Sequence, residues 1–210
     1  MIFFFLILSL FSAKASILTI DKDISQILRK ESLKEMISPK DLEKAQTTIQ
    51  QLFQAINPHM PAAGLAAPQI GISKPIFIFS WDRSVRNMQG AINPIFHPIG
   101  KEMVERWEGC FSVILSENGP YAAVKIPRYK AIKASFLGFD GQKVILELKG
   151  FAASVFQHEY DHLKGIVNID HPNAEIKSFS SKSELTAFLS EIKKSDLEEY
   201  IPPQIVDEKD

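Results

Sequence analysis

The sequence predicts an α+β fold in which short antiparallel β-sheets pack around a central helix, with a further helix near the C-terminus. Three observations predict this class. Apolar and polar residues alternate on both sides of Asp140-Gly141, which is typical of a β-hairpin. Residues 151–164 and 183–200 carry apolar side chains at helical spacing. The length of 210 residues suits one domain with short extensions.

The first half of the chain contains a candidate helix between two candidate strands. Residues 17–20 are expected to form a short strand. A helix is expected to begin with Ser38 as its N-cap and Pro39 at its first position, and Asn57-Pro58 ends it. A strand is expected over residues 75–81. The apolar set of the helix is Leu42, Ala45, Ile49, Leu52, Phe53 and Ile56.

The second half begins with the hairpin and continues with two helices. The hairpin strands are marked by alternating residues over 132–136 and 144–148. The helix from Phe151 to Lys164 is followed by Gly165, which favours a left-handed stop. Pro202-Pro203 ends the last helix, and the tail over 206–210 is expected to be frayed.

The first 16 residues differ from the rest and resemble a secretory leader. Residues 2–11 read IFFFLILSLF, too short an apolar run to span a bilayer as a helix. Ala13 and Ala15 form an A-x-A cleavage pattern, although no Lys or Arg precedes the apolar run. The leader favours export to a periplasmic or extracellular location, and no stable membrane span is expected after its removal. The expected divisions are a leader over 1–16, a catalytic domain over 17–170 and a C-terminal helix and tail over 171–210.

The overall composition excludes two classes of protein. The formal net charge is -1 and no run of Lys and Arg is interleaved with aromatic residues, so a nucleic-acid partner is not expected. Cys110 is the one cysteine in the chain, which excludes an internal disulfide. The oligomeric state does not follow from the sequence.

The sequence His158-Glu159-Tyr160-Asp161-His162 is the strongest chemical signal. Residues four apart share one face of a helix, so His158 and His162 can both reach one metal ion. Glu159 is then close enough to take a proton from a water molecule at that ion. Two histidines leave a catalytic centre one protein ligand short. The candidates for the third ligand are Cys110 and Glu184, while Asn168, which follows Gly165 at the spacing of a third histidine, is a poor substitute for imidazole.

Three segments resemble the signature motifs of the peptide deformylase family. They are Gly64-Leu65-Ala66-Ala67-Pro68-Gln69-Ile70-Gly71, Glu108-Gly109-Cys110-Phe111-Ser112 and Gln157 to Gly165, in the family's order. The resemblance covers roughly residues 17–170. It implies that Cys110, His158 and His162 hold one divalent metal ion, usually Fe2+ in the family, with Zn2+ or Ni2+ as other occupants.

The resemblance also implies an activity, the hydrolysis of the N-formyl group from N-formylmethionyl peptides. Glu159 would act as general base and then as general acid. The side-chain amide of Gln69 and the backbone N–H of Phe111 would donate hydrogen bonds to the formyl oxygen. Members of the family act on nascent chains in the cytoplasm or in organelles, so the secretory leader is unusual.

A further set of residues is expected to bind the substrate. Phe151, Ser154 and Val155 precede His158 by seven, four and three residues, so they line the same helix face. We expect them to form part of the pocket for the methionine side chain. The backbone of Ala63 and Gly64 is expected to pair with the bound peptide as an added strand.

The chain departs from the family pattern at several positions. Ala62 and Phe111 replace a glycine and a small aliphatic residue, and the segment Val113–Lys125 is longer than usual. These departures bear on substrate preference or rate. We also expect Asp161 and Arg128 to form an ion pair that braces the helix.

Two alternatives to a deformylase remain at this stage. One is a metalloendopeptidase that uses the same helix with Glu184 as the third ligand. The other is a divergent family member that binds formyl peptides or metal without turnover. The presence of both Glu159 and Gln69 argues against the second, because a binding protein needs no general base.

Overall fold

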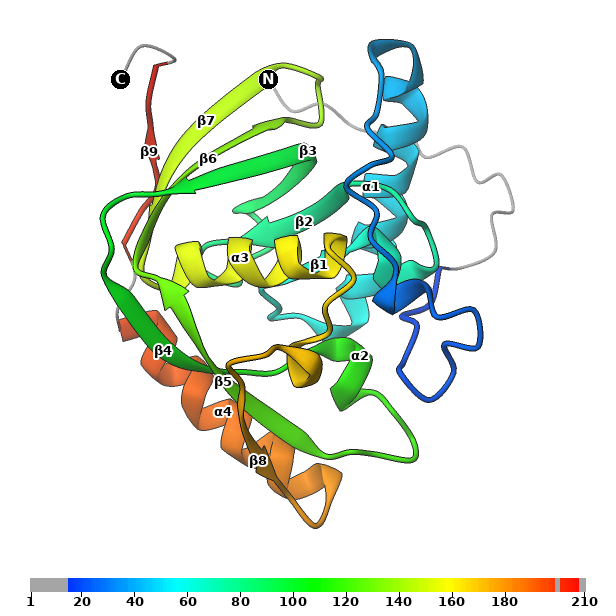
Figure 1. The fold of residues 1–210 in the computed structure, drawn as a ribbon, viewed down its shortest axis with the longest axis vertical. Helices are drawn as coiled ribbons and strands as arrows, with labels where there is room; N and C mark the ends of the chain where they lie inside the picture. The colour runs from blue at the N-terminus through cyan, green and yellow to red at the C-terminus, as the bar shows by residue number, and fades with distance from the viewer. Residues whose placement is uncertain (1–14, 199–200, 208–210) are drawn as a thin grey trace.

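The centre of the molecule is helix α3 (Phe151–Leu163). A computed structural model describes residues 15–198 and 201–207 of the chain. The helix lies between a larger and a smaller antiparallel sheet (Figure 1). Phe156 anchors it, because this side chain is fully buried and packs edge-to-face on Phe77 and Phe79. The expected α+β class, with a central helix carrying the two histidines, is confirmed.

The larger sheet curves over one side of α3 and forms most of the core. Its strand order is β1-β2-β3-β6-β7-β9, and every neighbouring pair is antiparallel. The expected strand over 75–81 and the expected hairpin are both confirmed, as β2 and as β6 with β7. The bounds are β1 Gly64–Ala66, β2 Ile76–Ser80, β3 Met88–Pro98, β6 Ala131–Leu137, β7 Lys143–Lys149 and β9 Gln204–Ile205.

The smaller sheet lies on the other side of α3 and is backed by the last helix. It contains β4 (Met103–Glu108), β5 (Ala122–Tyr129) and β8 (Glu175–Ser178), in the order β4-β5-β8. Helix α4 (Lys182–Glu198) packs on it through Leu185 and Leu189, which meet Trp107 of β4. The expected helix over 183–200 is confirmed as far as Glu198.

Helix α1 (Leu42–Ile56) covers the outer side of the larger sheet. Its apolar face packs on β2 through Ile49, Leu52 and other buried residues. The helix ends before Asn57-Pro58, as predicted. Its start differs, because residues Pro39–Asp41 form a 3-10 turn before the α-helix begins. The remaining short helices are α2 Phe111–Ile114 and the 3-10 turns η1 Ile27–Arg29, η3 Asn57–His59, η4 Ala67–Ile70 and η5 Asn168–Asp170.

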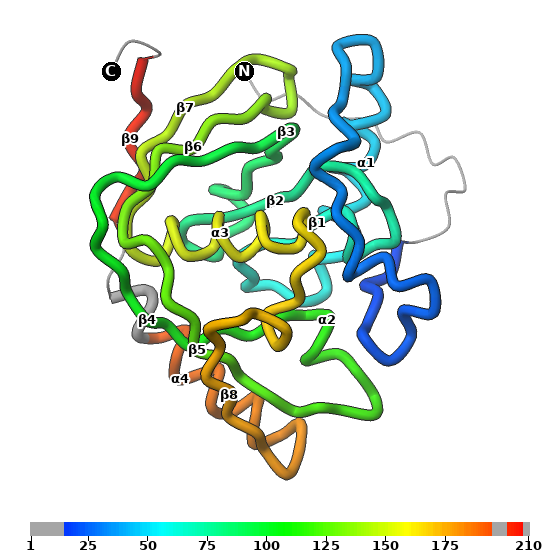
Figure 2. Tube along the Cα trace, in the orientation of Figure 1, coloured from blue at the N-terminus to red at the C-terminus, as the bar shows by residue number. Residues whose placement is uncertain are grey.

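The segment before α1 runs along the side of the molecule next to the end of α3 (Figure 2). Gly165 permits this approach, because its φ of +77° ends α3 and a Cβ there would lie 2.7 Å from the carbonyl oxygen of Arg29. The strand expected over 17–20 is wrong. These residues pair with no strand: the Leu18 N–H donates to the carbonyl of Gln69 in η4, and the Ile20 N–H donates to the carbonyl of Ser112 in α2.

The two ends of the chain differ from the sequence expectations in different ways. The expected leader falls almost wholly on residues 1–14, which lie outside the described residues. Near the C-terminus, Gln204–Ile205 pairs with β7, an addition to the sheet that the sequence did not predict. Within the described segments, no helix combines the length and apolar character needed to cross a membrane. The boundaries at residues 16 and 170 stay predictions.

Candidate metal centre and active site

Three side chains from two parts of the chain converge beside α3. His158 and His162 project from the same face of the helix, and Cys110 comes from the turn that precedes α2. One ligand atom from each of these residues lies within 4.8 Å of the other two. Cys110 Sγ lies 3.3 Å from His162 Nε2, and both side chains are buried. The three expected ligands are therefore brought together.

The donor chemistry of this cluster fits a transition-metal ion. One thiol and two imidazoles form a ligand set of three, which leaves a fourth position for water or substrate. Glu184 does not join them. Its carboxylate accepts hydrogen bonds from the N–H and the hydroxyl of Ser180, at the exposed start of α4. The ligand set that the endopeptidase alternative requires is therefore not formed.

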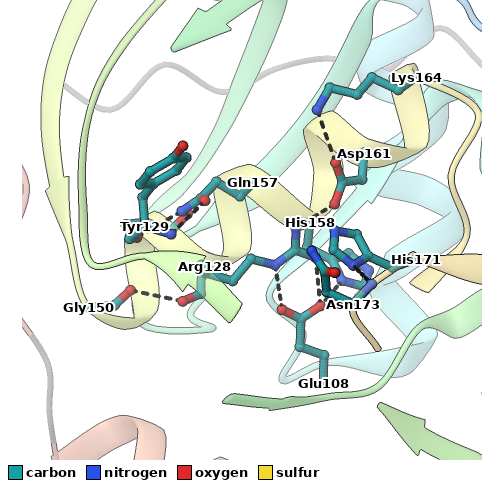
Figure 3. Close-up of polar contacts among 12 residues, drawn as sticks. Glu108, Arg128, Tyr129, Gly150, Gln157, His158, Asp161, Lys164, His171 and Asn173 are labelled. Atoms are coloured by element: carbon teal, nitrogen blue, oxygen red, sulfur yellow. Dashed lines mark hydrogen bonds and ion pairs between the residues drawn. The ribbon is translucent and has the colours of Figure 1, made fainter. Parts of the chain in front are cut away.

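His158 is oriented by a carboxylate that sequence reasoning missed. Its Nδ1 lies 2.7 Å from Glu108 Oε2, so Nε2 is the ring nitrogen left to face a metal ion. Arg128 donates to both oxygens of Glu108, at 2.8 Å and 3.0 Å, and also bonds Asp161 (Figure 3). The expected pair of Arg128 and Asp161 is confirmed. The one feature of the sequence that could have indicated this role is the position of Glu108, two residues before Cys110.

The charges of this buried network depend on one another. Burial alone would raise the pKa of Glu108, but the Arg128 guanidinium and His158 bring it down to about 2. Burial opposes the charge on His158, yet hydrogen bonding to Cys110 and Glu108 raises its pKa well above the ordinary value. Burial and the nearby charge of His158 lower the pKa of His162. The network therefore holds the carboxylate of Glu108 in its charged form next to His158.

Glu159 is held beside the cluster as a buried and partly unpaired carboxyl group. Burial raises its pKa to about 7, in the range that suits a group that accepts and returns a proton. Its Oε2 is buried and has no hydrogen-bond partner. Gly64 lies against the carboxylate of Glu159, because a Cβ on this glycine would be 2.5 Å from Glu159 Oε1. The glycine thus makes room for the carboxylate.

Gln69 has one end of its amide fixed and the other directed at the cluster. The N–H of Ala66 donates to Oε1 at 2.8 Å, which leaves Nε2 to donate to Ser112 Oγ at 3.2 Å and toward Cys110 Sγ at 3.6 Å. Helix α2 begins at Phe111, so the backbone N–H of Phe111 has no acceptor within the helix. Both expected donors therefore lie next to the cysteine.

A pocket lies next to His158, Glu159 and Gln69. The expected substrate-binding residues Ala63, Gly64, Phe151, Ser154 and Val155 all line it. Strand β1 is the edge of the larger sheet, so its outer side offers backbone groups to an added strand. The opposite wall, which the sequence did not predict, comes from β4, α2 and α4. The main residues of that wall are Arg106, Trp107, Ile114, Leu189, Ile192 and Lys193.

The departures from the expected motif are accommodated without distortion. Ala62 is buried, and it is not among the described residues that need a positive φ. The ring of Phe111 lies 5.3 Å from the ring of His59 and packs on the α1 side of the core. The long segment after Cys110 lines the pocket with Ile114 and then runs to the N-terminal segment, where Glu117 pairs with Lys22.

Comparisons with known proteins agree with this geometry. A family model described as polypeptide deformylase matches residues 15–178. A peptide deformylase 1 of Bordetella pertussis is 37% identical over 134 residues, covering 60% of this chain and 71% of that protein. A peptide deformylase of Thermotoga maritima is 40% identical over 129 residues, covering 61% and 72%. A crystal structure of peptide deformylase from Thermotoga maritima superposes with a TM-score of 0.60 at 33% identity, covering 74% of this chain and 95% of that one.

Proposed function

The chain belongs to the polypeptide deformylase family, and we propose that Cys110, His158 and His162 are the metal ligands with which it acts. The protein is a hydrolase that removes the N-formyl group from N-formylmethionyl peptides and releases formate. The observation that carries the assignment of roles is the convergence of these ligand atoms within 4.8 Å, directly beside Glu159 and Gln69.

A divalent ion held by these ligands would act as a Lewis acid and lower the pKa of a water molecule at its open position. Glu159 accepts a proton from the attacking water as its oxygen bonds to the formyl carbon. The same carboxyl then gives the proton to the departing amine of methionine, as the C–N bond breaks. A carboxyl group whose pKa is near 7 suits both roles at neutral pH.

Two hydrogen-bond donors stabilise the charge that develops on the formyl oxygen. We assign them as Gln69 Nε2 and the backbone N–H of Phe111. The bond from Ala66 to Gln69 Oε1 fixes the orientation of the amide before substrate arrives. A donor of this kind typically lowers the barrier by about 3–4 kcal/mol.

The peptide extends from this centre along the open edge of β1. Backbone groups of Gly64 pair with it as with an added strand, which tolerates many side chains beyond the methionine, whereas the carbonyl of Ala63 already accepts a hydrogen bond from the Ser80 N–H at 2.7 Å. The methionine side chain enters the pocket beside Phe151, Ser154 and Val155 of α3. Phe151 and Val155 are apolar, and such a wall suits an unbranched thioether side chain.

Fe2+ is the resident metal that we propose, with Zn2+ and Ni2+ able to occupy the same ligands. A set of one thiolate and two imidazoles binds each of these ions. An iron enzyme of this kind is sensitive to oxygen, because the Cys110 thiolate is open to oxidation once the ion is lost.

The test is formate release from formyl-Met-Ala-Ser by protein that lacks residues 1–15. The protein is purified without oxygen and loaded with Fe2+ or Ni2+. Glu159→Ala should abolish release but keep the metal, and Cys110→Ala should lose both. Glu184→Ala is the matched control and should behave as the wild type. Metal-loaded, folded protein that releases no formate would overturn the proposal.

We also propose that residues 1–15 direct the enzyme out of the cytoplasm. The support is the apolar run followed by the Ala13-Lys14-Ala15 pattern. Such an enzyme would meet released formyl peptides instead of ribosomes. N-terminal sequencing of the protein from cell fractions tests this, and a cytoplasmic protein with an intact N-terminus would refute it.

A further inference from the structure

Helix α4 gives the catalytic pocket a wall that carries a cation. Thr186, Leu189, Ser190 and Lys193 follow one another at i, i+3, i+4 and i+7, so they share one face, and all of them line the pocket. Apart from Glu108 and Glu159, which serve the metal centre and the reaction, the charged residues that line the pocket are the cations Arg83, Arg106 and Lys193.

Lys193 is a half-buried cation without a counter-ion among the described residues. Its Nζ donates one long hydrogen bond, of 3.4 Å, to the carbonyl oxygen of Pro61. Burial lowers the pKa of Lys193, and the like charge of Arg83 adds to that effect. The neighbouring Lys194 differs, because it is exposed and pairs with Glu191 at 2.8 Å. A ligand carboxylate at Lys193 would supply the missing partner.

The position of Lys193 along the substrate path follows from the residues that lead into β1. Gly64 stands against Glu159, where the formyl group reacts, and Pro61 precedes Gly64 by three residues. Three residues of extended chain span at most about 10 Å, at roughly 3.3 Å per residue. A peptide laid along this edge, with its formyl group at Glu159, would bring its second or third residue near Lys193.

We propose that Lys193 binds a carboxylate carried by the second or third residue of the substrate peptide. This inference rests on the proposed path of the peptide along β1. Two kinds of substrate offer such a group: a short formyl peptide with a free C-terminus, and a longer chain with Asp or Glu at its second or third position. The enzyme would then prefer these substrates to neutral ones.

The experiment compares three peptides on the metal-loaded enzyme: formyl-Met-Ala-Ser with a free carboxylate, its C-terminal amide, and formyl-Met-Ala-Glu amide. One charge-assisted hydrogen bond corresponds to about a tenfold preference in kcat/KM, carried by KM. We expect the free acid to exceed its amide by this factor in the wild type. The third peptide distinguishes a side-chain carboxylate from a terminal one.

Three variants connect that preference to Lys193. Lys193→Met should bring the acid and the amide to equal kcat/KM. Lys193→Arg should keep the preference, and Lys194→Met should match the wild type. The preference should also shrink as salt is added, because screening weakens a partly exposed ion pair.

The outcomes separate this inference from the proposed function. Formate release at equal rates from all three peptides in the wild type would overturn the role of Lys193 and leave the deformylase intact. An acid preference that survives in Lys193→Met would also overturn it. Absence of release from every peptide would instead overturn the assigned mechanism. Calorimetry with Met-Ala-Ser and its amide would then still test the role of Lys193. That role predicts that the free acid binds more tightly than the amide.

Discussion

Gly64→Ala should damage catalysis through the position of one carboxylate. The added Cβ would lie 2.5 Å from Glu159 Oε1 and 2.8 Å from Cγ and Cδ. Strand β1 cannot easily retreat, because Gly64 is paired with Phe79 in β2. Ordinary contacts begin at 3.4 Å, so the carboxylate has to move by about 0.9 Å. A displacement of about 1 Å costs roughly a hundredfold in rate, so we expect kcat to fall by about that factor.

The assay is formate release at saturating peptide, with metal content and unfolding temperature measured on the same preparation. Gly90→Ala is a matched control, because a Cβ there would lie 2.7 Å from Ile49 Cδ1, in the core between β3 and α1. Overpacking of this kind costs about 1–3 kcal/mol of stability. Gly90→Ala should thus lower the unfolding temperature and keep kcat. A wild-type kcat in Gly64→Ala, or an equal loss in both variants, would refute the reasoning.

Two further predictions concern the network beneath the metal ligands. Glu108→Gln should weaken metal binding by about 10–100-fold, because His158 loses the carboxylate that orients it, and a chelator competition assay measures the change. An unchanged affinity would show that the helix alone positions His158. Asp161→Asn should destabilise the protein by about 3 kcal/mol and lower its metal content, because buried Arg128 loses one of its two carboxylates. Denaturant unfolding and metal analysis test this, and normal metal content would contradict the bracing role.

Much of the candidate site could be predicted because its signals are local. His158, Glu159 and His162 lie within one helical turn, so the period of the helix alone places them on one face. The hairpin of β6 and β7 was also predictable, since the Asp140-Gly141 turn and the alternation on both sides indicate the same structure. The role of Cys110 needed the resemblance to the family, because nothing local connects it to α3.

Two of the strands that the sequence did not predict, β3 and β5, break the local rules. Strand β3 changes register between Ile92 and Ile95, and Asn93 has a φ of +51°, so its alternation is interrupted. Strand β5 contains Pro127, a residue that normally argues against a strand. Both are held by their neighbours in the sheets. Their stability comes from pairing across the sheet, which a single segment does not reveal.

The sequence by itself determined the reacting group, two metal ligands and the helix that presents them, because these depend on spacing within a few residues. Only the tertiary structure decided which carboxylate orients His158, how closely Gly64 approaches Glu159, and that Lys193 on the last helix faces the pocket. Each of these contacts joins residues far apart in the chain. They exist because the packing of two sheets against α3 brings those residues together, and no local pattern encodes that distance.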